Sequence, residues 1–450
     1  MNILIAILIF TVIIVIHELG HFLLAKKNGI FVTEFSVGMG PRLISLVKTA
    51  NGYRPRFLLS QHDFEHTQEW KDTTKYSWKL FPIGGSCMML GEDESIEDDR
   101  AFNKKGVWAR ISVTLAGPIF NFILAFILAM VLIGIIGYDP SRITVVEENS
   151  PAQSAGLLAN DTLTKINGNR IDLGREFFVY LQMHPLSEQN VELTYVRDGV
   201  THETTVSPRY VKTYYIDNNM QIDDSATITG IKDDNPFAVA GIVKGDTIVK
   251  INDVAINNRE GLVKYIQENP LTADDILITY TRDGVEKTVS VTPDVAGSYK
   301  MGISVNLARE KVGALGVIKY SAIEVKYLIV STIQSLGQLI TGKVSSDDIA
   351  GPVGIVNFIG NTYEESKSEG FLMVFLNLAN ISILLSANLG VMNLLPIPAL
   401  DGGRLVFLIL EVFRGKPVDQ SKEGLVHMIG FVALMILMVF VMFNDLSNIF

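Results

Sequence analysis

Four long stretches of the chain are dominated by apolar residues. The first runs from Ile3 to Ile16 and continues past three polar residues to Ala25, and the others cover 111–138, 370–400 and 424–444. About 20 helical residues cross a hydrocarbon layer of roughly 30 Å, so each stretch is long enough to span a membrane. The pattern predicts transmembrane helices within 1–25, 107–138, 370–413 and 424–444.

The distribution of lysine and arginine predicts how these helices are oriented. Both residue types are frequent in residues 26–106 and in the short loop before the fourth stretch, but neither occurs at the two chain ends. By the positive-inside rule, both loops lie in the cytoplasm and both termini lie outside. Residues 139–369 are then extracytoplasmic, and a region of that length can be translocated whatever its charge.

The outer region contains an internal repeat. Residues 150–171 align without a gap with 235–256, and YVRDGV from position 195 aligns with YTRDGV from position 280 at the same offset. Each copy reads as a short helix that ends at a glycine, an alternating strand, and a hairpin with an Asp-Gly turn. Two copies of domain size indicate a tandem duplication, so we expect α+β domains at 142–212 and 224–305. Residues 313–343 are irregularly amphipathic, which favours a helix on the membrane surface.

The composition agrees with a membrane protein and argues against other classes. Charged residues make up 19% of the 450 residues, apolar residues make up 48%, and the mean hydropathy is +0.29. Such a chain is too apolar for a disordered protein and too sparsely charged for an ordinary soluble enzyme. The net charge of −10 argues against nucleic acid as a partner, and the single cysteine, Cys87, rules out an intrachain disulfide.

A candidate metal site lies at the end of the first apolar stretch. His17-Glu18-Leu19-Gly20-His21 has two histidines four positions apart, so both imidazoles share one face of a helix and can bind one ion. Glu18 is close enough to act as a general base on a water molecule beside that ion. Ionisable side chains in a membrane span are energetically costly, which favours a functional role for these residues. The alternative, that they are only the polar end of the helix, is less favoured because Lys26 and Lys27 already mark the interface.

A third metal ligand is expected on another membrane segment, because catalytic zinc normally has three protein ligands and an open position. The third apolar stretch ends with Pro396, Pro398 and Asp401, followed by two glycines. The prolines break a helix there, and an unwound segment at membrane depth has to line protein or water. Asp401 is therefore the predicted third ligand. As an alternative or in addition, it could be the N-cap of a helix that starts at Gly402.

The motifs together resemble a known family. His-Glu-x-x-His in the first span, with Asn-x-x-Pro-x-Pro-x-x-Asp-Gly in a later span, resembles the site-2 protease family of intramembrane zinc metalloproteases. The repeats resemble the bacterial, permuted type of PDZ domain, which captures extended peptides or chain termini. A tandem PDZ pair between the second and third spans resembles the bacterial branch typified by the regulator of sigma-E protease. A rigid spacer is the alternative for this pair.

The resemblance implies a polytopic α-helical protein of the bacterial cell membrane. It would have four transmembrane helices, a re-entrant β-hairpin region within 26–106, and two extracytoplasmic PDZ-like α+β domains. The implied substrates are transmembrane segments of single-span membrane proteins, such as anti-sigma-factor fragments or remnant signal peptides. Peptide termini at the PDZ domains and the lipid bilayer are the other implied partners.

The resemblance also assigns roles to individual residues. It implies one zinc ion per chain, Zn2+, held by His17, His21 and Asp401, with Glu18 as the catalytic glutamate. It implies that Asn393, with Asn388 as a second similar position, holds the unwound substrate backbone. The glycines implied in the re-entrant region beside the zinc are Gly38, Gly40, Gly84 and Gly85. This chain departs from the family at Ser86 and Cys87, where relatives usually carry an aromatic residue and valine.

Two other functions compete with proteolysis. A metal transporter could use the same histidines, but it predicts acidic or histidine residues along several spans. Apart from Asp401, the later spans offer only His427. A non-catalytic PDZ receptor or scaffold is the second alternative, and in such a protein Glu18 would be dispensable.

Overall fold

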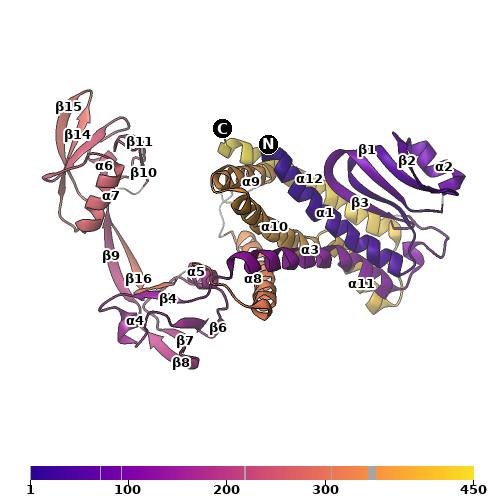
Figure 1. Cartoon of the computed structure of the whole chain (residues 1–450), viewed down its shortest axis with the longest axis horizontal. Helices are drawn as coiled ribbons and strands as arrows, with labels where there is room; N and C mark the ends of the chain where they lie inside the picture. Colours follow the sequence, from indigo (N-terminus) through magenta and orange to yellow (C-terminus); the bar gives the residue numbers. More distant parts are fainter. Residues whose placement is uncertain are drawn as a thin grey trace. The chain divides into compact units, whose positions relative to one another are not determined.

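The computed structural model describes residues 2–70, 72–92, 94–216, 219–305, 307–342 and 351–449. The chain divides into two compact units (Figure 1). We call Met1–Tyr138 with Arg309–Phe450 the membrane unit, and Asp139–Ala308 the repeat unit.

The membrane unit is built from long helices. They are α1 (Asn2–Lys27), α3 (Val107–Ile136), α8 (Ala314–Ile340), α9 (Pro352–Lys367), α10 (Phe371–Leu394), α11 (Asp401–Arg414) and α12 (Gln420–Ile449). In the described part of the chain, four helices are long and apolar enough to cross a membrane: α1, α3, α10 and α12. This confirms the four predicted spanning stretches by length and composition.

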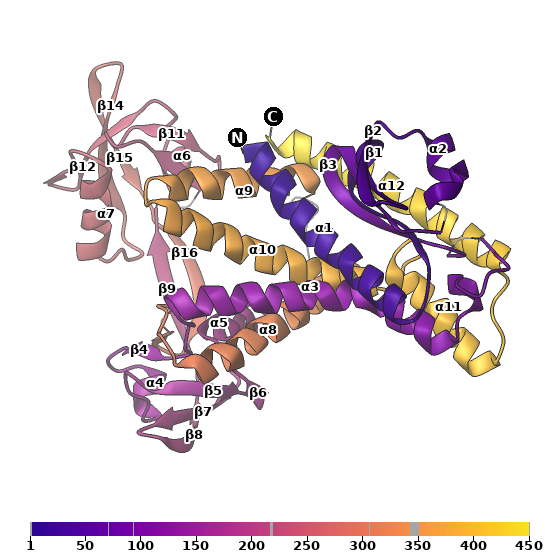
Figure 2. The ribbon, with the colours of Figure 1, turned by 45° about the vertical axis from the view of Figure 1, so that its right-hand side comes forward.

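Helix α3 lies at the centre of this unit and runs beside α10 (Figure 2). Small residues of α3, including Ala125 and Ala129, form a core with Ile383 and Ala387 of α10. Small side chains let helix backbones approach closely, which is how helices pack where lipid offers no hydrophobic driving force. Val325 and Leu328 of α8 join the same core, so α8 packs against two candidate spans.

A curled sheet follows α1 in the chain. Its strands are β1 (Val32–Thr49), β2 (Gly52–Phe57) and β3 (Lys75–Met89), in the order β2-β1-β3, and β1 and β3 are both long and bent (Figure 2). Residues 32–37 of β1 pair on one side with 85–89 and on the other side with 75–78. The second half of β3 is therefore an outer edge of the sheet. The short helices of this region are α2 (Gln61–His66), η1 (Gln68–Trp70) and η2 (Phe102–Lys104).

The repeat unit contains the same elements twice at the offset seen in the sequence. The first copy has β4 (Ile143–Val146), α4 (Pro151–Ser154), β5 (Thr162–Ile166), β6 (Asn169–Arg170), α5 (Gly174–Met183), β7 (Val191–Arg197) and β8 (Val200–Val206). The second has β11 (Ile228–Ile231), α6 (Pro236–Val239), β12 (Thr247–Ile251), β13 (Val254–Ala255), α7 (Arg259–Glu268), β14 (Ile276–Arg282) and β15 (Val285–Val291). Each copy has its own hydrophobic core, so each is a folding module.

The ends of the two copies differ from the predicted boundaries. In the second copy, β11 pairs with the preceding strand β10 (Met220–Ile222). In the first copy, β4 pairs with β17 (Ile303–Val305), and Met301 and Val305 belong to the first core. Strands β9 (Arg209–Tyr215) and β16 (Asp294–Lys300) pair along the connection. Residues 301–305, which the sequence placed in the second domain, thus complete the sheet pairing and the core of the first.

Candidate active site

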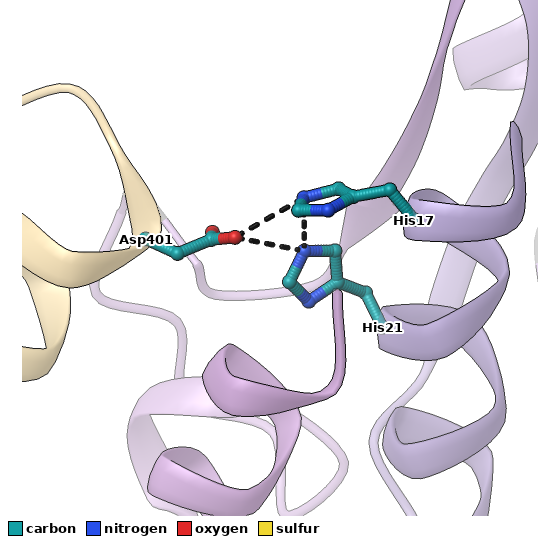
Figure 3. A group of neighbouring side chains, drawn as sticks. All are labelled: His17, His21 and Asp401. Carbon is teal, nitrogen blue, oxygen red and sulfur yellow. Dashed lines mark hydrogen bonds and ion pairs between the residues drawn. The ribbon is translucent and has the colours of Figure 1, made fainter. Parts of the chain in front are cut away.

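Two histidines of α1 and one aspartate of α11 converge on a single point (Figure 3). The Nε2 atoms of His17 and His21 lie 3.1 Å apart. The Oδ2 atom of Asp401 lies 3.1 Å from Nε2 of His17 and 3.4 Å from Nε2 of His21. Both histidines are only 7% exposed. The structure therefore brings together three predicted site residues that are far apart in the chain.

The geometry of these three atoms fits a zinc ion. Two ligands at about 2.0–2.1 Å from a tetrahedral zinc are roughly 3.3 Å apart, close to the three separations observed. Beyond the two imidazole nitrogens, the buried Oδ2 of Asp401 has no hydrogen-bonding partner in the described part of the chain. Three converging acceptor atoms repel one another unless a cation lies between them. The donor set of two imidazoles and one carboxylate suits zinc.

Glycines allow α1 and α3 to approach closely enough to form the site. A Cβ atom added at Gly20 would lie 2.7 Å from the carbonyl carbon of Ala116 and closer still to its oxygen. A Cβ atom added at Gly117 would lie 2.6 Å from Nε2 of His17 and even closer to Nε2 of His21. Only glycine at these positions leaves room for both the helix crossing and the imidazole rings.

Helix α3 also orients the two rings. Nδ1 of His21 lies 2.8 Å from the carbonyl oxygen of Val113, to which it can only donate, so Nε2 of the neutral ring presents a lone pair. Nδ1 of His17 lies 3.3 Å from Nδ2 of the Asn121 side-chain amide, and Oδ1 of this amide has no hydrogen-bonding partner among the described residues. The two ends of an amide are interchangeable by a 180° rotation, and with Oδ1 turned to His17 the oxygen accepts a hydrogen bond from Nδ1–H, which leaves the lone pair of Nε2 free for a metal.

Sequence reasoning missed Asn121, although a signal was present. It is the only side-chain amide in α3, three positions after Pro118. A single buried amide in an apolar span is a reason to expect a polar partner.

Asp401 reaches the site because the chain unwinds between α10 and α11. Pro396 and Pro398 lie in this connection, and α11 then begins at Asp401 with Leu400 as its N-cap residue. The alternative prediction that Asp401 is the N-cap is therefore wrong. Its side chain faces the histidines instead. Gly402 and Gly403 lie directly against the backbone of the connection, where a Cβ atom would clash.

A cavity of about 320 Å³ opens beside the three residues. Its wall includes Glu18, Cys87, Asn393 and the ion pair of Glu92 with Arg404. Glu18 thus faces the same space as the candidate metal ligands. The cavity is large enough for a segment of extended peptide beside the histidines, and it contains several polar groups that could orient a peptide bond.

The other predicted site residues are found in different environments. Asn393 lines the cavity, but Oδ1 of Asn388 accepts a hydrogen bond from Thr332 of α8 at 2.5 Å, and Asn388 is absent from the described cavity wall. Gly85 lies beside the face of α1 that carries Glu18, since a Cβ atom there would be 3.4 Å from Cγ of Glu18. Gly38, Gly40 and Gly84 have positive φ angles of 87°, 88° and 83°, which glycine adopts without strain. They shape the bends of β1 and β3.

The two departures from the family also lie near the site. Cys87 is buried and lines the cavity, whereas the hydroxyl of Ser86 forms a hydrogen bond of 2.7 Å with that of Ser36 on β1. Both residues lie in the second half of β3, where Cys87 pairs with Phe35 and Ser86 with Ser36 of β1.

Fold and site together point to a class of protein: a membrane metallopeptidase, with a candidate metal site between the spanning helix α1 and the shorter helix α11. The sequence model of Peptidase family M50 matches residues 5–60 and 64–437. The chain belongs to this family, the site-2 proteases.

Curated relatives match over the whole chain. Zinc metalloprotease RasP of Geobacillus kaustophilus is 31% identical over 99% of this chain and 97% of its own length. Its namesake from Bacillus licheniformis is 31% identical over the full length of both chains. Regulator of sigma-W protease RasP of Bacillus subtilis is 28% identical over 99% of this chain and 98% of its own length.

One solved structure matches part of the chain. The PDZ domain of HtrA3 bound to a phage-derived ligand covers 20% of this chain at 19% identity with a TM-score of 0.17. This likeness is too low to argue from.

Membership of the family confirms the predicted enzyme class. The protein is a multi-pass intramembrane endopeptidase, and zinc is its metal.

Proposed function

We propose that His17, His21 and Asp401 hold the catalytic zinc and that Glu18 handles the proton in peptide-bond hydrolysis. The convergence of two imidazole nitrogens and one carboxylate oxygen within 3.4 Å of one another carries this proposal. Glu18 is one position from His17, so it is displaced around α1 yet faces the same cavity.

The proposed mechanism uses few groups. When bound, zinc supplies a Lewis acid that polarises the scissile carbonyl and makes a water molecule acidic at neutral pH. The Glu18 carboxylate accepts the proton of this water and returns it to the leaving amine. Asn121 and the carbonyl of Val113 keep the two imidazoles in the tautomer that binds metal. Asn393 is placed to donate hydrogen bonds to the substrate backbone from the cavity wall.

The substrate would be a transmembrane segment in extended form. The outer part of β3 runs beside α1: Thr11 Oγ1 donates a hydrogen bond of 2.5 Å to the carbonyl of Pro82, and Gly85 lies next to Glu18. A strand edge binds any peptide backbone by main-chain hydrogen bonds. A helical substrate would have to unwind before it could use this edge. His17 is roughly 21 Å along α1 from Ile3, which puts cleavage near the cytoplasmic side in the proposed orientation.

The sheet itself supports a re-entrant arrangement. Ile44 and Trp78 are paired neighbours on one face and are 39% and 59% exposed, whereas the paired Ser45 and Ser77 on the other face are buried and hydrogen-bonded to each other. The apolar face is thus the exposed one, and the polar face is covered. An exposed apolar face on a membrane enzyme is best explained by contact with lipid. We infer that this sheet dips into the bilayer from the cytoplasmic side.

The repeat unit is proposed to lie outside the cell, as are both termini. Its second copy has a cavity of about 400 Å³ between β10 and α7, whose lining includes Ile222, Arg259 and Leu262. A groove between a strand edge and a helix suits an extended peptide or a chain terminus. We propose that the two copies act as PDZ-like domains that either bind such a peptide or exclude substrates with bulky outer domains.

The substrates proposed are single-span membrane proteins in regulated proteolysis. One relative is named regulator of sigma-W protease, which favours an anti-sigma-factor fragment, and remnant signal peptides offer the same kind of short membrane segment. The metal-transporter alternative is weakened by His427, because its Nδ1 already accepts a hydrogen bond from the amide of Ala399 at 2.8 Å.

The test of the catalytic proposal is Glu18→Gln. In purified full-length protein, this variant should lose cleavage of a single-span reporter substrate and keep the zinc content of the wild type, because Glu18 does not bind the metal. Turnover that survives in the variant, with zinc present, would exclude Glu18 as the proton-transfer group.

A further inference from the structure

The connection that carries Asp401 contains a strained residue. Ala399 has a φ angle of +76°, and this left-handed conformation is unfavourable for a residue with a Cβ atom. Such a conformation persists only where neighbouring groups hold it. Asp401 follows two residues later, so whatever holds Ala399 also fixes the direction in which the chain enters α11.

The group that holds Ala399 comes from α12. Nδ1 of His427 accepts a hydrogen bond from the backbone amide of Ala399 at 2.8 Å. Because a backbone amide can only donate, this nitrogen is unprotonated, and the neutral ring carries its proton on Nε2. Oε1 of Glu423, one turn earlier on α12, lies 3.9 Å from Nε2 and favours a proton there.

A second contact joins the same face of α12 to the same connection. Gly430 lies three positions after His427, which is close to one helical turn. A Cβ atom added at Gly430 would lie 2.8 Å from the carbonyl oxygen of Pro398 and closer still to its Cβ. The helix therefore touches the backbone of the connection directly, and only a glycine permits this approach.

Most of α12 is otherwise exposed. Only 6% of its most apolar window is buried in the structure. His427 and Gly430 are therefore unusual on this helix, because they meet the connection between α10 and α11 at two successive residues, Pro398 and Ala399.

We propose that His427 is a positioning residue for the metal site. Its hydrogen bond holds Ala399 in the left-handed conformation. Together with the close contact at Gly430, this bond fixes the connection so that Oδ2 of Asp401 lies beside the two imidazoles. The inference rests on the proposed role of Asp401 as a zinc ligand. It gives α12 a function besides crossing the membrane: the position of this helix and the affinity for zinc are coupled.

The experiment compares variants of the full-length protein in detergent. His427→Leu removes the acceptor, and His427→Asn retains one, because its Oδ1 takes a position close to that of Nδ1. Gly430→Ala pushes α12 away from Pro398. Gly424→Ala is the matched control on the same helix, because a Cβ atom there meets nothing within 4 Å. The readouts are the zinc dissociation constant, measured by competition with a chelator, and kcat and KM for a single-span reporter.

The expected result is a loss of zinc affinity of about 10- to 100-fold in His427→Leu and Gly430→Ala, the range seen when groups behind a metal ligand are removed. The kcat at subsaturating zinc should fall in parallel, with KM little changed. His427→Asn and Gly424→Ala should stay within about threefold of the wild type. If His427→Leu fails to fold, the Gly430→Ala and Gly424→Ala pair decides.

Two outcomes would overturn the inference in different ways. Wild-type zinc affinity in both His427→Leu and Gly430→Ala, with a clear loss in Asp401→Ala, would show that α12 does not set the ligand. Unchanged affinity in Asp401→Ala would remove Asp401 from the metal site, and with it both the proposed ligand set and the support by α12.

Discussion

Replacing Gly117 by alanine should disrupt the zinc site although Gly117 binds no metal. The added methyl carbon would lie 2.6 Å from Nε2 of His17 and closer to Nε2 of His21. Ordinary contact distances between such atoms are about 3.5 Å, so the overlap is about 1 Å. Metal–ligand distances tolerate only about 0.2 Å. The rings must therefore turn away, or α1 and α3 must separate, by more than the metal site can accept.

The size of the effect follows from what is displaced. Removing a group that merely orients a ligand costs about 10- to 100-fold in metal affinity. Because the methyl group displaces the ligands themselves, we expect at least a 100-fold loss, or about 2.7 kcal/mol. Gly134 is the matched control, since it lies on the same helix and a Cβ atom there meets nothing within 4 Å. Gly134→Ala should leave zinc affinity unchanged and slightly stabilise α3, because alanine has the higher helix propensity.

The assay is a chelator competition on purified protein, with cleavage of a reporter substrate measured on the same samples. Thermal stability measured without zinc reports whether Gly117→Ala still folds. The reasoning is refuted if Gly117→Ala folds, binds zinc as tightly as Gly134→Ala, and cleaves at the same rate. In that case the close contact of α3 with the imidazoles would have no role in the site.

Three further predictions concern other parts of the chain. Asp401→Ala should lower both zinc content and cleavage, and full occupancy by metal analysis would contradict its role as a ligand. Deleting residues 139–308 should allow cleavage of an untrimmed substrate, meaning one that still carries its bulky outer domain, because the unit proposed to exclude it is gone. Tyr138 and Glu310 pair as neighbours, so a loop of about two to five residues can close the gap. If a well-folded deletion variant cuts only a substrate whose outer domain has been removed, the repeat unit does not exclude substrates by size. In the second repeat, burial opposes ionisation of Asp246, but hydrogen bonds from Arg282 and a backbone amide outweigh it and keep its pKa below the usual value. This stabilisation is present above the unfolded pKa of about 3.9 and is lost as the pH falls through the folded pKa. Asp246→Asn should therefore make the free energy of unfolding less dependent on acid pH, as measured by denaturation at a series of pH values. An unchanged acid dependence would contradict this.

The parts of the site that the sequence determined are the local ones. His17 and His21 share a face because four residues make about one helical turn, and the prolines before Asp401 mark a break whatever the helix packs against. The repeat was likewise visible, because the offset between its copies is constant through loops and strands. These features follow from rules that act within a few residues.

Distinguishing Asn388 from Asn393 required the tertiary structure. Five positions on a helix correspond to a rotation of about 140°, so the two amides leave α10 in different directions. The sequence cannot say which direction faces the cavity. In the structure Asn393 lines it, whereas Asn388 meets Thr332 on α8.

The same limit applies to the groups that support the metal ligands. Val113, Gly117 and Asn121 lie about a hundred residues after the histidines, and His427 follows Asp401 on a different helix. The strand β17 joins the first repeat across the whole of the second. Periodicity fixes which side of each element is apolar, but only packing decides which element meets that side. The sequence by itself therefore indicated the candidate ligands and the enzyme class, and the tertiary structure decided which distant residues lie against those candidates.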